Sequence, residues 1–204
     1  MSLEKNPSDL YGEKYWAGRM LSQSDTHVTR GEDNGNYWNT AIFISEVLGT
    51  YGGSSALDVG CGRGFLVRHL RNLGFQADGI EYGHWAVENS VCNSKWGDLT
   101  EALPAADANY DLVSAIGVIT HIGKPALPHA LGELRRVTKK FLFTNILTMW
   151  HETQAHHKTF MPPSFWKPKI EEAGFRELME AHPMIQRHGF RNSEWQWCAL
   201  WERV

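Results

Sequence analysis

From residue 56 onward, blocks of hydrophobic residues alternate between strand-like runs and helical spacing. The runs that predict buried strands are 56–59, 76–80, 110–116 and 141–146, with a brief strand near 95–96. The segments whose apolar positions predict helices are 65–73, 84–90 and 127–137. Because parallel strands need a crossover connection, this alternation predicts right-handed βαβ units in an α/β fold. We expect helices on both faces of the sheet.

The C-terminal third follows a different pattern. A helix is predicted over residues 165–173, and Gly174 follows it. Two extended segments come next, at about 175–181 and 195–202, with no long helix between them. Such neighbours form an antiparallel pair. The whole pattern therefore predicts a doubly wound, mostly parallel seven-stranded sheet with an antiparallel C-terminal hairpin.

In residues 1–40, polar and aromatic residues alternate without a regular period. A helix is predicted from about 39 to 49. With 204 residues, the chain is long enough for one domain with a full core. We expect residues 1–50 to form a lid or helical extension. Residues 51–204 are expected to form the doubly wound domain.

Composition narrows the classes of partner. The net charge of −3 provides no basic surface for a nucleic-acid strand, so no nucleic-acid partner is expected. The three cysteines form no metal-binding spacing. Residues 1–10 lack the apolar core of a signal peptide, and no apolar run of about 18 residues is present to cross a membrane. We expect a cytoplasmic protein with no membrane partner, as a monomer or homodimer.

The strongest chemical motif follows the first buried strand, where Asp58 leads into glycines spaced two apart: Gly60, Gly62 and Gly64. Glycine lets the backbone approach a ligand closely, and the helix that opens next points amide groups at it. A dinucleotide fingerprint would have its third glycine at position 65, which is Phe65. The run LDVGCGRGF resembles the first motif of the class I, Rossmann-like S-adenosylmethionine-dependent methyltransferases.

This resemblance implies a site for S-adenosylmethionine at the strand ends. Glu81 would accept the ribose hydroxyls, Asp98 the adenine amino group, and the amide of Leu99 would meet a ring nitrogen. The alternatives are that Glu81 is a solvated acid at the strand end and that Asp98 is a helix N-cap or a turn acid. The full set of expected cofactor-binding residues is Tyr15, Asp58, Gly60, Cys61, Gly62, Gly64, Glu81, Tyr82, Asp98, Leu99 and Ile116.

Two histidines are the candidate catalytic residues. His121 ends an apolar segment that follows the strand at 110–116, and the resemblance places it beside the methyl donor. An imidazole suits proton transfer near neutral pH, so His121 is the candidate general base. The alternative is a histidine that closes the site or bonds a backbone carbonyl. His157, or its neighbour His156, is the second candidate, because related enzymes carry a histidine before a helix start like the one at 163–166.

The cluster at 151–157 also raises the question of a metal. Its histidines match no common metal-binding spacing, so no metal is expected. An acceptor-binding loop and an exposed segment remain the two interpretations.

The N-terminal aromatic residues are the candidate lid, and the resemblance implies that Tyr11 or Tyr15 reaches the methionine part of the cofactor. We expect methyl transfer to an oxygen or nitrogen, possibly a carbon, of a small molecule such as a sugar or natural-product intermediate. The alternatives are a protein or nucleic-acid methyltransferase, a NAD-dependent oxidoreductase and a silent binding module. One departure from the family pattern is the basic run at 137–141, where a Pro-Gly-Gly turn is common.

Overall fold

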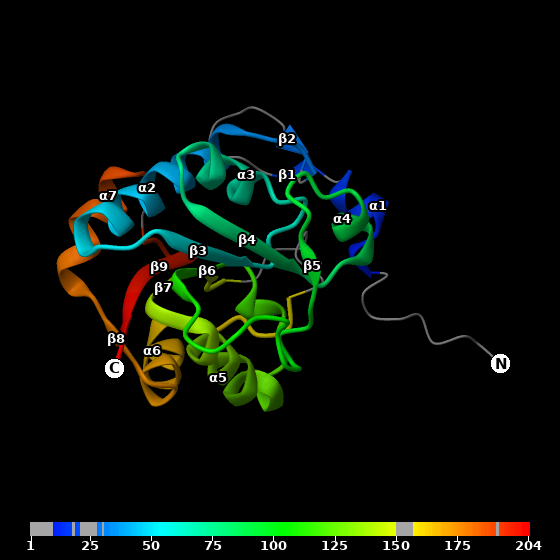
Figure 1. Cartoon of the computed structure of the whole chain (residues 1–204). Coiled ribbons are helices and arrows are strands. Elements are labelled where there is room, and N and C mark those ends of the chain that lie inside the picture. Colours follow the sequence, from blue (N-terminus) through cyan, green and yellow to red (C-terminus); the bar gives the residue numbers. More distant parts are fainter. Residues whose placement is uncertain (1–9, 18, 21–27, 30, 150–156, 191) are drawn as a thin grey trace.

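A seven-stranded sheet runs through the centre of the computed structural model, which describes residues 10–17, 19–20, 28–29, 31–149, 157–190 and 192–204. In chain order its strands are β3 (Ser55–Val59), β4 (Gln76–Glu81), β5 (Lys95–Trp96), β6 (Tyr110–Ile116), β7 (Thr138–Leu147), β8 (Phe175–Glu177) and β9 (Gln196–Arg203). Their order across the sheet is β5-β4-β3-β6-β7-β9-β8 (Figure 1). The strands from β5 to β7 are parallel, and β9 is antiparallel to both β7 and β8. The predicted sheet and its antiparallel C-terminal hairpin are confirmed.

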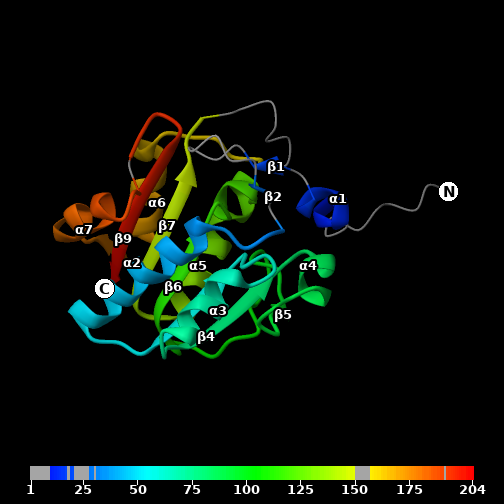
Figure 2. The ribbon, with the colours of Figure 1, turned by 90° about the horizontal axis from the view of Figure 1, so that it is seen from above.

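Helices cover both faces of this sheet (Figures 1 and 2). On one side lie α2 (Gly35–Tyr51), α3 (Phe65–Asn72) and α7 (His182–Arg187), and on the other α5 (Leu127–Val137) and α6 (Pro163–Glu172). Each face has its own apolar cluster, and the adjacent residues Leu142 and Phe143 of β7 belong to opposite ones. This is the period-two alternation of a strand buried on both faces. Within the described ranges, no helix is long and apolar enough to cross a membrane.

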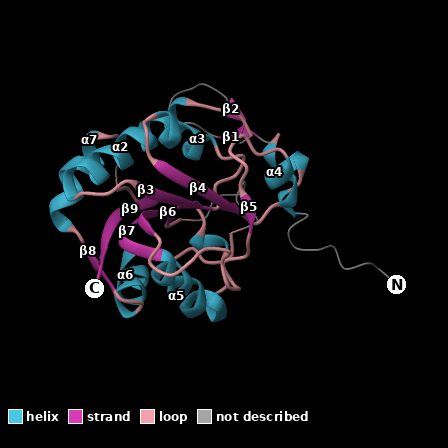
Figure 3. Ribbon diagram, in the orientation of Figure 1, coloured by secondary structure: helices cyan, strands magenta, loops and turns pink. Residues whose placement is uncertain are grey.

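Smaller elements surround the edge of the sheet near β5 (Figure 3). The one-turn helix α1 (Glu13–Trp16) lies beside α4 (His84–Glu88), and β1 (Arg19–Met20) pairs with β2 (Val28–Thr29). Elsewhere in the described residues, short 3-10 helices include η2 (Ile119–His121), η3 (Lys124–Ala126) and η5 (Met179–Ala181).

The helix expected from about 39 to 49 is longer than predicted. It begins at Gly35, because the Asn34 side chain accepts a hydrogen bond from the amide of Asn36 over 3.0 Å and caps it. Its first turn, Gly35–Trp38, contains no aliphatic residue, so aliphatic spacing marks only the later turns. Phe43 and Leu48 of this helix lie in the same core cluster as α3. The division of the chain at residue 50 stays a prediction.

The C-terminal hairpin also differs in detail. The extended segment expected to reach 181 ends at Glu177, and η5 and α7 follow it. Pro183 lies in the first turn of α7, where its fixed φ favours a helix. Ile185 buries the apolar face of this short helix. The basic run at 137–141 forms no separate turn, since α5 ends at Val137 and β7 begins with the next residue.

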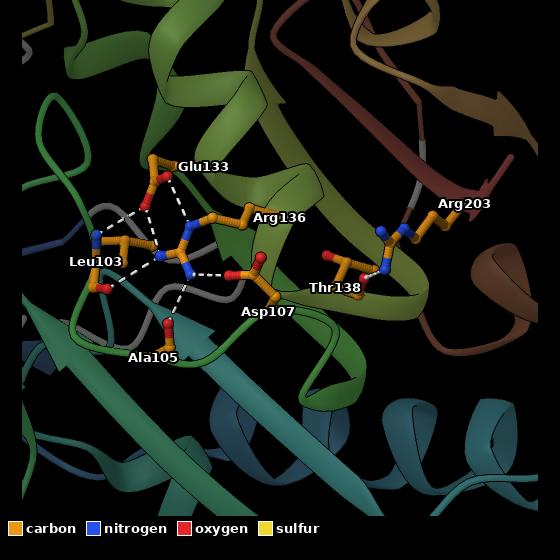
Figure 4. A network of polar contacts seen from close by, with 7 residues as sticks. All are labelled: Leu103, Ala105, Asp107, Glu133, Arg136, Thr138 and Arg203. Atoms are coloured by element: carbon orange, nitrogen blue, oxygen red, sulfur yellow. Dashed lines mark hydrogen bonds and ion pairs between the residues drawn. The ribbon is translucent and has the colours of Figure 1, made fainter.

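A polar network fixes the segment between β5 and β6 to α5 (Figure 4). Glu133 Oε2 accepts the amide of Leu103 over 2.7 Å and a guanidinium N–H of Arg136 over 2.8 Å. The same guanidinium donates to the carbonyls of Leu103 and Ala105 and to the carboxylate of Asp107. These charge-assisted bonds satisfy backbone groups that no strand pairing reaches. The loop that follows β5 is thereby held against α5.

Candidate active site

The glycine-rich loop lies at the carboxyl ends of β3 and β4, where α/β sheets bind ligands. The amides of Gly60 and Cys61 both donate to the carbonyl of Ile80, over 2.8 and 3.1 Å, and tie the loop to β4. Gly64 caps α3 in a left-handed conformation with φ of 83°. The first turn of α3 therefore opens directly from the loop.

Protein side chains occupy the space that each of these three glycines leaves, as Gly62 and Gly64 illustrate. Gly62 has φ of 56°, and a Cβ atom there would lie 2.7 Å from the ring of Trp16. A Cβ atom on Gly64 would lie 2.1 Å from the sulfur of Cys92. The sequence analysis attributed the need for glycine at these positions to the close approach of a ligand. The structure adds a second reason, which is that Trp16 and Cys92 pack against the loop.

Glu81 ends β4 and is buried. Its two carboxylate oxygens accept the amides of Gly62 over 2.8 Å and Gly83 over 2.7 Å. Burial raises the pKa of Glu81, and these amide hydrogen bonds act in the opposite direction. A carboxylate has about four lone-pair sites, so the amides orient it and leave capacity for ligand hydroxyls. This arrangement fits the ribose of an adenosyl group.

Asp58 lies deeper, beneath the loop. It pairs with Ser114 across β3 and β6, and the Ser114 hydroxyl donates to its carboxylate over 2.7 Å. Burial raises the pKa of Asp58 to about 7. Ile116 ends β6 beside this pair and is half-buried. Asp58 therefore joins the end of β3, just before the loop, to β6.

The third strand end carries Asp98 and Leu99. The Asp98 carboxylate accepts hydrogen bonds from the amide and the hydroxyl of Thr100, each over 2.8 Å. These are the contacts of a turn acid, which was the alternative role for Asp98. Leu99 is buried in the core. An adenine contact for both residues stays a prediction. Nearby, the Trp96 indole donates to the carbonyl of Tyr82 over 2.9 Å.

The N-terminal aromatic residues meet the strand ends. Tyr11 makes edge-on ring contacts with Tyr15, Tyr82 and His121, at centroid distances of 5.0, 5.9 and 5.6 Å. Its hydroxyl lies 2.9 Å from Nδ1 of His121. Burial, then the neighbouring Tyr15 and Glu81, raise the pKa of Tyr11 well above its usual value. Tyr11 thus lies between the end of β4 and the candidate base.

His121 and His157 come together although the chain separates them widely. Their ring centroids lie 3.8 Å apart, with an angle of 33° between the planes. The Thr120 hydroxyl lies 2.6 Å from Nδ1 of His157. The amides of Lys158 and Thr159 both donate to the Thr120 carbonyl, over 2.8 and 3.0 Å. These bonds fix the segment that follows residue 156 to η2.

Two residues at this site were missed by the sequence analysis. The Trp16 indole donates to the Tyr11 carbonyl over 2.9 Å while its ring covers Gly62. Adjacent aromatics in an otherwise polar segment were the available signal for Trp16. Thr120 carried no signal beyond its place next to His121.

The metal question concerns the stretch at 151–157. His151, Glu152 and His156 lie outside the described residues. Elsewhere, among the residues that are described, no three histidines, cysteines or acids gather as a metal site would require.

Comparisons with known proteins agree with this geometry. Residues 57–141 match the family described as "Methyltransferase domain". The ubiquinone biosynthesis O-methyltransferase of Pseudoalteromonas translucida (strain TAC 125) is 26% identical over 161 residues, which is 66% of this chain and 68% of that protein.

The solved structures that share the fold include two methyltransferases. The CcbJ methyltransferase of Streptomyces caelestis aligns with a TM-score of 0.68 at 12% identity, over 85% of this chain and 98% of that one. An S-adenosylmethionine-dependent methyltransferase from Clostridium acetobutylicum ATCC 824 aligns with a TM-score of 0.66 at 10% identity, over 85% and 94% of the two chains.

The family match begins at the glycine-rich motif and extends into β7, so it spans the strand ends described above. The protein is an enzyme, and its cofactor is S-adenosylmethionine. Residues 57–141 therefore form a methyltransferase domain, and the chain resembles the class I, Rossmann-like S-adenosylmethionine-dependent methyltransferases.

Proposed function

We propose that this enzyme methylates an oxygen or nitrogen atom of a small molecule that binds beside His121 and His157. The close pair of imidazoles, 3.8 Å apart, is the observation that carries the proposal. Val118, which precedes η2, packs so closely on Gly60 that a Cβ atom there would lie 2.3 Å from its methyl group. This contact supports a location for the imidazoles next to the cofactor loop.

The cofactor supplies an electrophilic methyl group on a sulfonium. We assign its amino-acid part to the glycine-rich loop and Tyr15, its ribose to Glu81, and its adenine to Tyr82, Asp98 and Leu99. Asp58 would act through the loop that follows β3. The loop offers backbone amides, and the buried Glu81 carboxylate is already oriented by two of them.

His121 would take the proton from an acceptor hydroxyl or amine. The usual imidazole pKa, about 6.5, suits this step, and general base catalysis typically contributes ~10²–10⁴-fold. His157 would orient the acceptor, since Thr120 fixes its ring. Holding the acceptor in line can lower the barrier by about 7–11 kcal/mol. An oxygen acceptor is supported by the name of the relative, an O-methyltransferase.

The same proposal covers the partners and the N-terminal residues. The net charge of −3 favours a small acceptor over a nucleic acid. Residues 1–50 would act partly as a lid, since Trp16 covers the cofactor loop. Excluding water there strengthens the electrostatic interactions around a bound sulfonium.

A screen of hydroxyl- and amine-bearing small molecules tests the proposal. Purified enzyme is incubated with S-adenosylmethionine and each molecule, and mass spectrometry looks for a product heavier by one CH₂ unit. We expect such a product, and we expect His121→Gln to lower kcat by about 10²–10⁴-fold without changing cofactor affinity by calorimetry.

His129→Gln is the matched control, because His129 is an exposed histidine of α5 and should keep normal turnover. Methylation confined to proteins or nucleic acids would contradict the proposed acceptor class. A His121→Gln enzyme that turns over at the wild-type rate would contradict the proposed base.

A further inference from the structure

The contact between Tyr11 and His121 joins residues 110 positions apart in the chain, with Oη of the tyrosine 2.9 Å from Nδ1 of the histidine. The proposed function makes no use of it. We propose that Tyr11 is a positioning residue that holds His121 in the tautomer with its proton on Nδ1. The basic lone pair then lies on Nε2. This inference rests on the proposed role of His121 as the base.

Tyr11 is suited to a neutral role. Its ring is half-buried and packs edge-on against Tyr15 and Tyr82. Burial and the nearby Glu81 carboxylate disfavour a phenolate, which is why the pKa of Tyr11 is raised. The group that faces His121 is therefore a hydroxyl, which can both donate and accept a hydrogen bond.

The direction of this hydrogen bond follows from the requirement that a general base keep a lone pair free to accept a proton. If Nδ1–H donates to the Tyr11 oxygen, the same bond persists after the ring takes a second proton on Nε2. If the hydroxyl donated to Nδ1 instead, Nε2 would already carry the proton in the neutral ring. The first arrangement lets His121 gain and lose a proton without rearranging its partner.

The rest of the structure fixes Tyr11 in place. The Trp16 indole donates to the Tyr11 carbonyl over 2.9 Å. A Cβ atom on Gly83 would lie 2.9 Å from Cβ of Tyr11, so only glycine leaves room for the tyrosine here. Because Trp16 also covers Gly62, the orientation of His121 is linked to the packing of the cofactor loop.

Long-range ¹H–¹⁵N NMR correlations distinguish the two histidine tautomers and require no acceptor. The His121 signals are assigned with His121→Gln, and wild type is compared with Tyr11→Phe, which keeps the aromatic ring. We expect wild-type His121 to be mainly protonated on Nδ1, and Tyr11→Phe to shift the majority to the Nε2-protonated form. In the acceptor assay, Tyr11→Phe should lower kcat at least several-fold and leave the KM for S-adenosylmethionine unchanged.

Tyr51→Phe is the matched control. Tyr51 packs on Phe141 near the opposite end of the sheet, so its loss should leave the His121 signals unchanged. If Tyr11→Phe fails to fold, Trp16→Phe removes the donor to the Tyr11 carbonyl and should shift the tautomers in the same direction.

A wild-type His121 protonated on Nε2, or the same tautomer in wild type and Tyr11→Phe, would overturn the inference. The proposed function fails by a different result, the absence of turnover on any small molecule or normal turnover by His121→Gln. The two failures are therefore distinguishable.

Discussion

The amide of Gly62 donates to Oε2 of Glu81 over 2.8 Å and joins the loop after β3 to the acid that ends β4. The other oxygen of Glu81 accepts the amide of Gly83 over 2.7 Å. One carboxylate therefore orients the loops that follow two neighbouring parallel strands. Glu81, which we propose accepts the ribose hydroxyls, therefore also fixes the two loops that form the cofactor site.

Glu81→Gln replaces one acceptor oxygen with an NH₂ group, which faces an amide donor in either orientation of the side chain. We expect the affinity for S-adenosylhomocysteine, measured by calorimetry, to fall by about 10–100-fold, since hydrogen bonds to a charged group contribute about 1.5–3 kcal/mol. Glu88→Gln, on the exposed end of α4, is the control. Wild-type affinity in Glu81→Gln would remove the ribose assignment.

Gly62→Ala should destabilise the protein more than Gly74→Ala. Both glycines have positive φ, 56° and 90°, where an alanine costs about 1–2 kcal/mol. Only at Gly62 would the new methyl group meet a neighbour, the Trp16 ring at 2.7 Å, whereas nothing lies within 4 Å at Gly74. Urea unfolding measures the difference. Equal losses in the two variants would show that the Trp16 ring moves aside freely. In a double-mutant cycle, Trp16→Ala should remove the additional destabilisation that Gly62→Ala causes relative to Gly74→Ala.

Asp58 predicts a pH dependence of stability. Its pKa is raised from 3.8 to about 7 in the folded protein, so between these values the folded state binds a proton that the unfolded state lacks. The contribution of Asp58 to the free energy of unfolding therefore falls as pH rises from about 4 to 7, and it is constant above that. Asp58→Asn cannot titrate and still accepts the Ser114 hydroxyl.

Urea unfolding of wild type and Asp58→Asn across this pH range checks that sign. The variant should gain stability relative to wild type as pH rises to about 7, and the gap should then stay constant. A gap that is independent of pH would mean that Asp58 titrates normally in the folded protein.

Arg136→Leu should be strongly destabilising. It leaves the Glu133 carboxylate, which is 8% exposed, without its guanidinium partner. Breaking a buried pair in this way costs about 3–5 kcal/mol, and the partial exposure of Arg136 favours the lower value. Arg176→Leu is the matched control, because Arg176 pairs with Glu202 on the surface, where a pair contributes about 0–1 kcal/mol. Similar losses in both variants would contradict the structural role of the network.

Much of the sheet could be predicted because β6, β7 and β9 each contain a nearly continuous apolar run. Where apolar spacing is weak, the prediction was less complete. The first turn of α2 has no aliphatic residue and depends on the Asn34 cap. β1 and β2 contain two residues each, which is too short to show a period. The helix α7 was missed because it has six residues and interrupts two extended segments.

The candidate site shows the same division. The glycine-rich loop and Glu81 are marked by local spacing, so the sequence places them at adjacent strand ends. Tyr11 and His121 were each named as candidates, yet their hydrogen bond joins residues 110 positions apart. It depends on how α1 lies against α4 and on the packing of Trp16 over Gly62, which are tertiary contacts that no local pattern encodes.

The position of β9 has a consequence for synthesis on the ribosome. Because β9 lies between β7 and β8, the described part of β8 has no other partner in the sheet, and it must wait for residues up to Arg203 to emerge. Until then a nascent chain presents an open edge along β7. Chaperones that capture unpaired strand edges would therefore bind this domain in the interval between the emergence of β7 and that of β9.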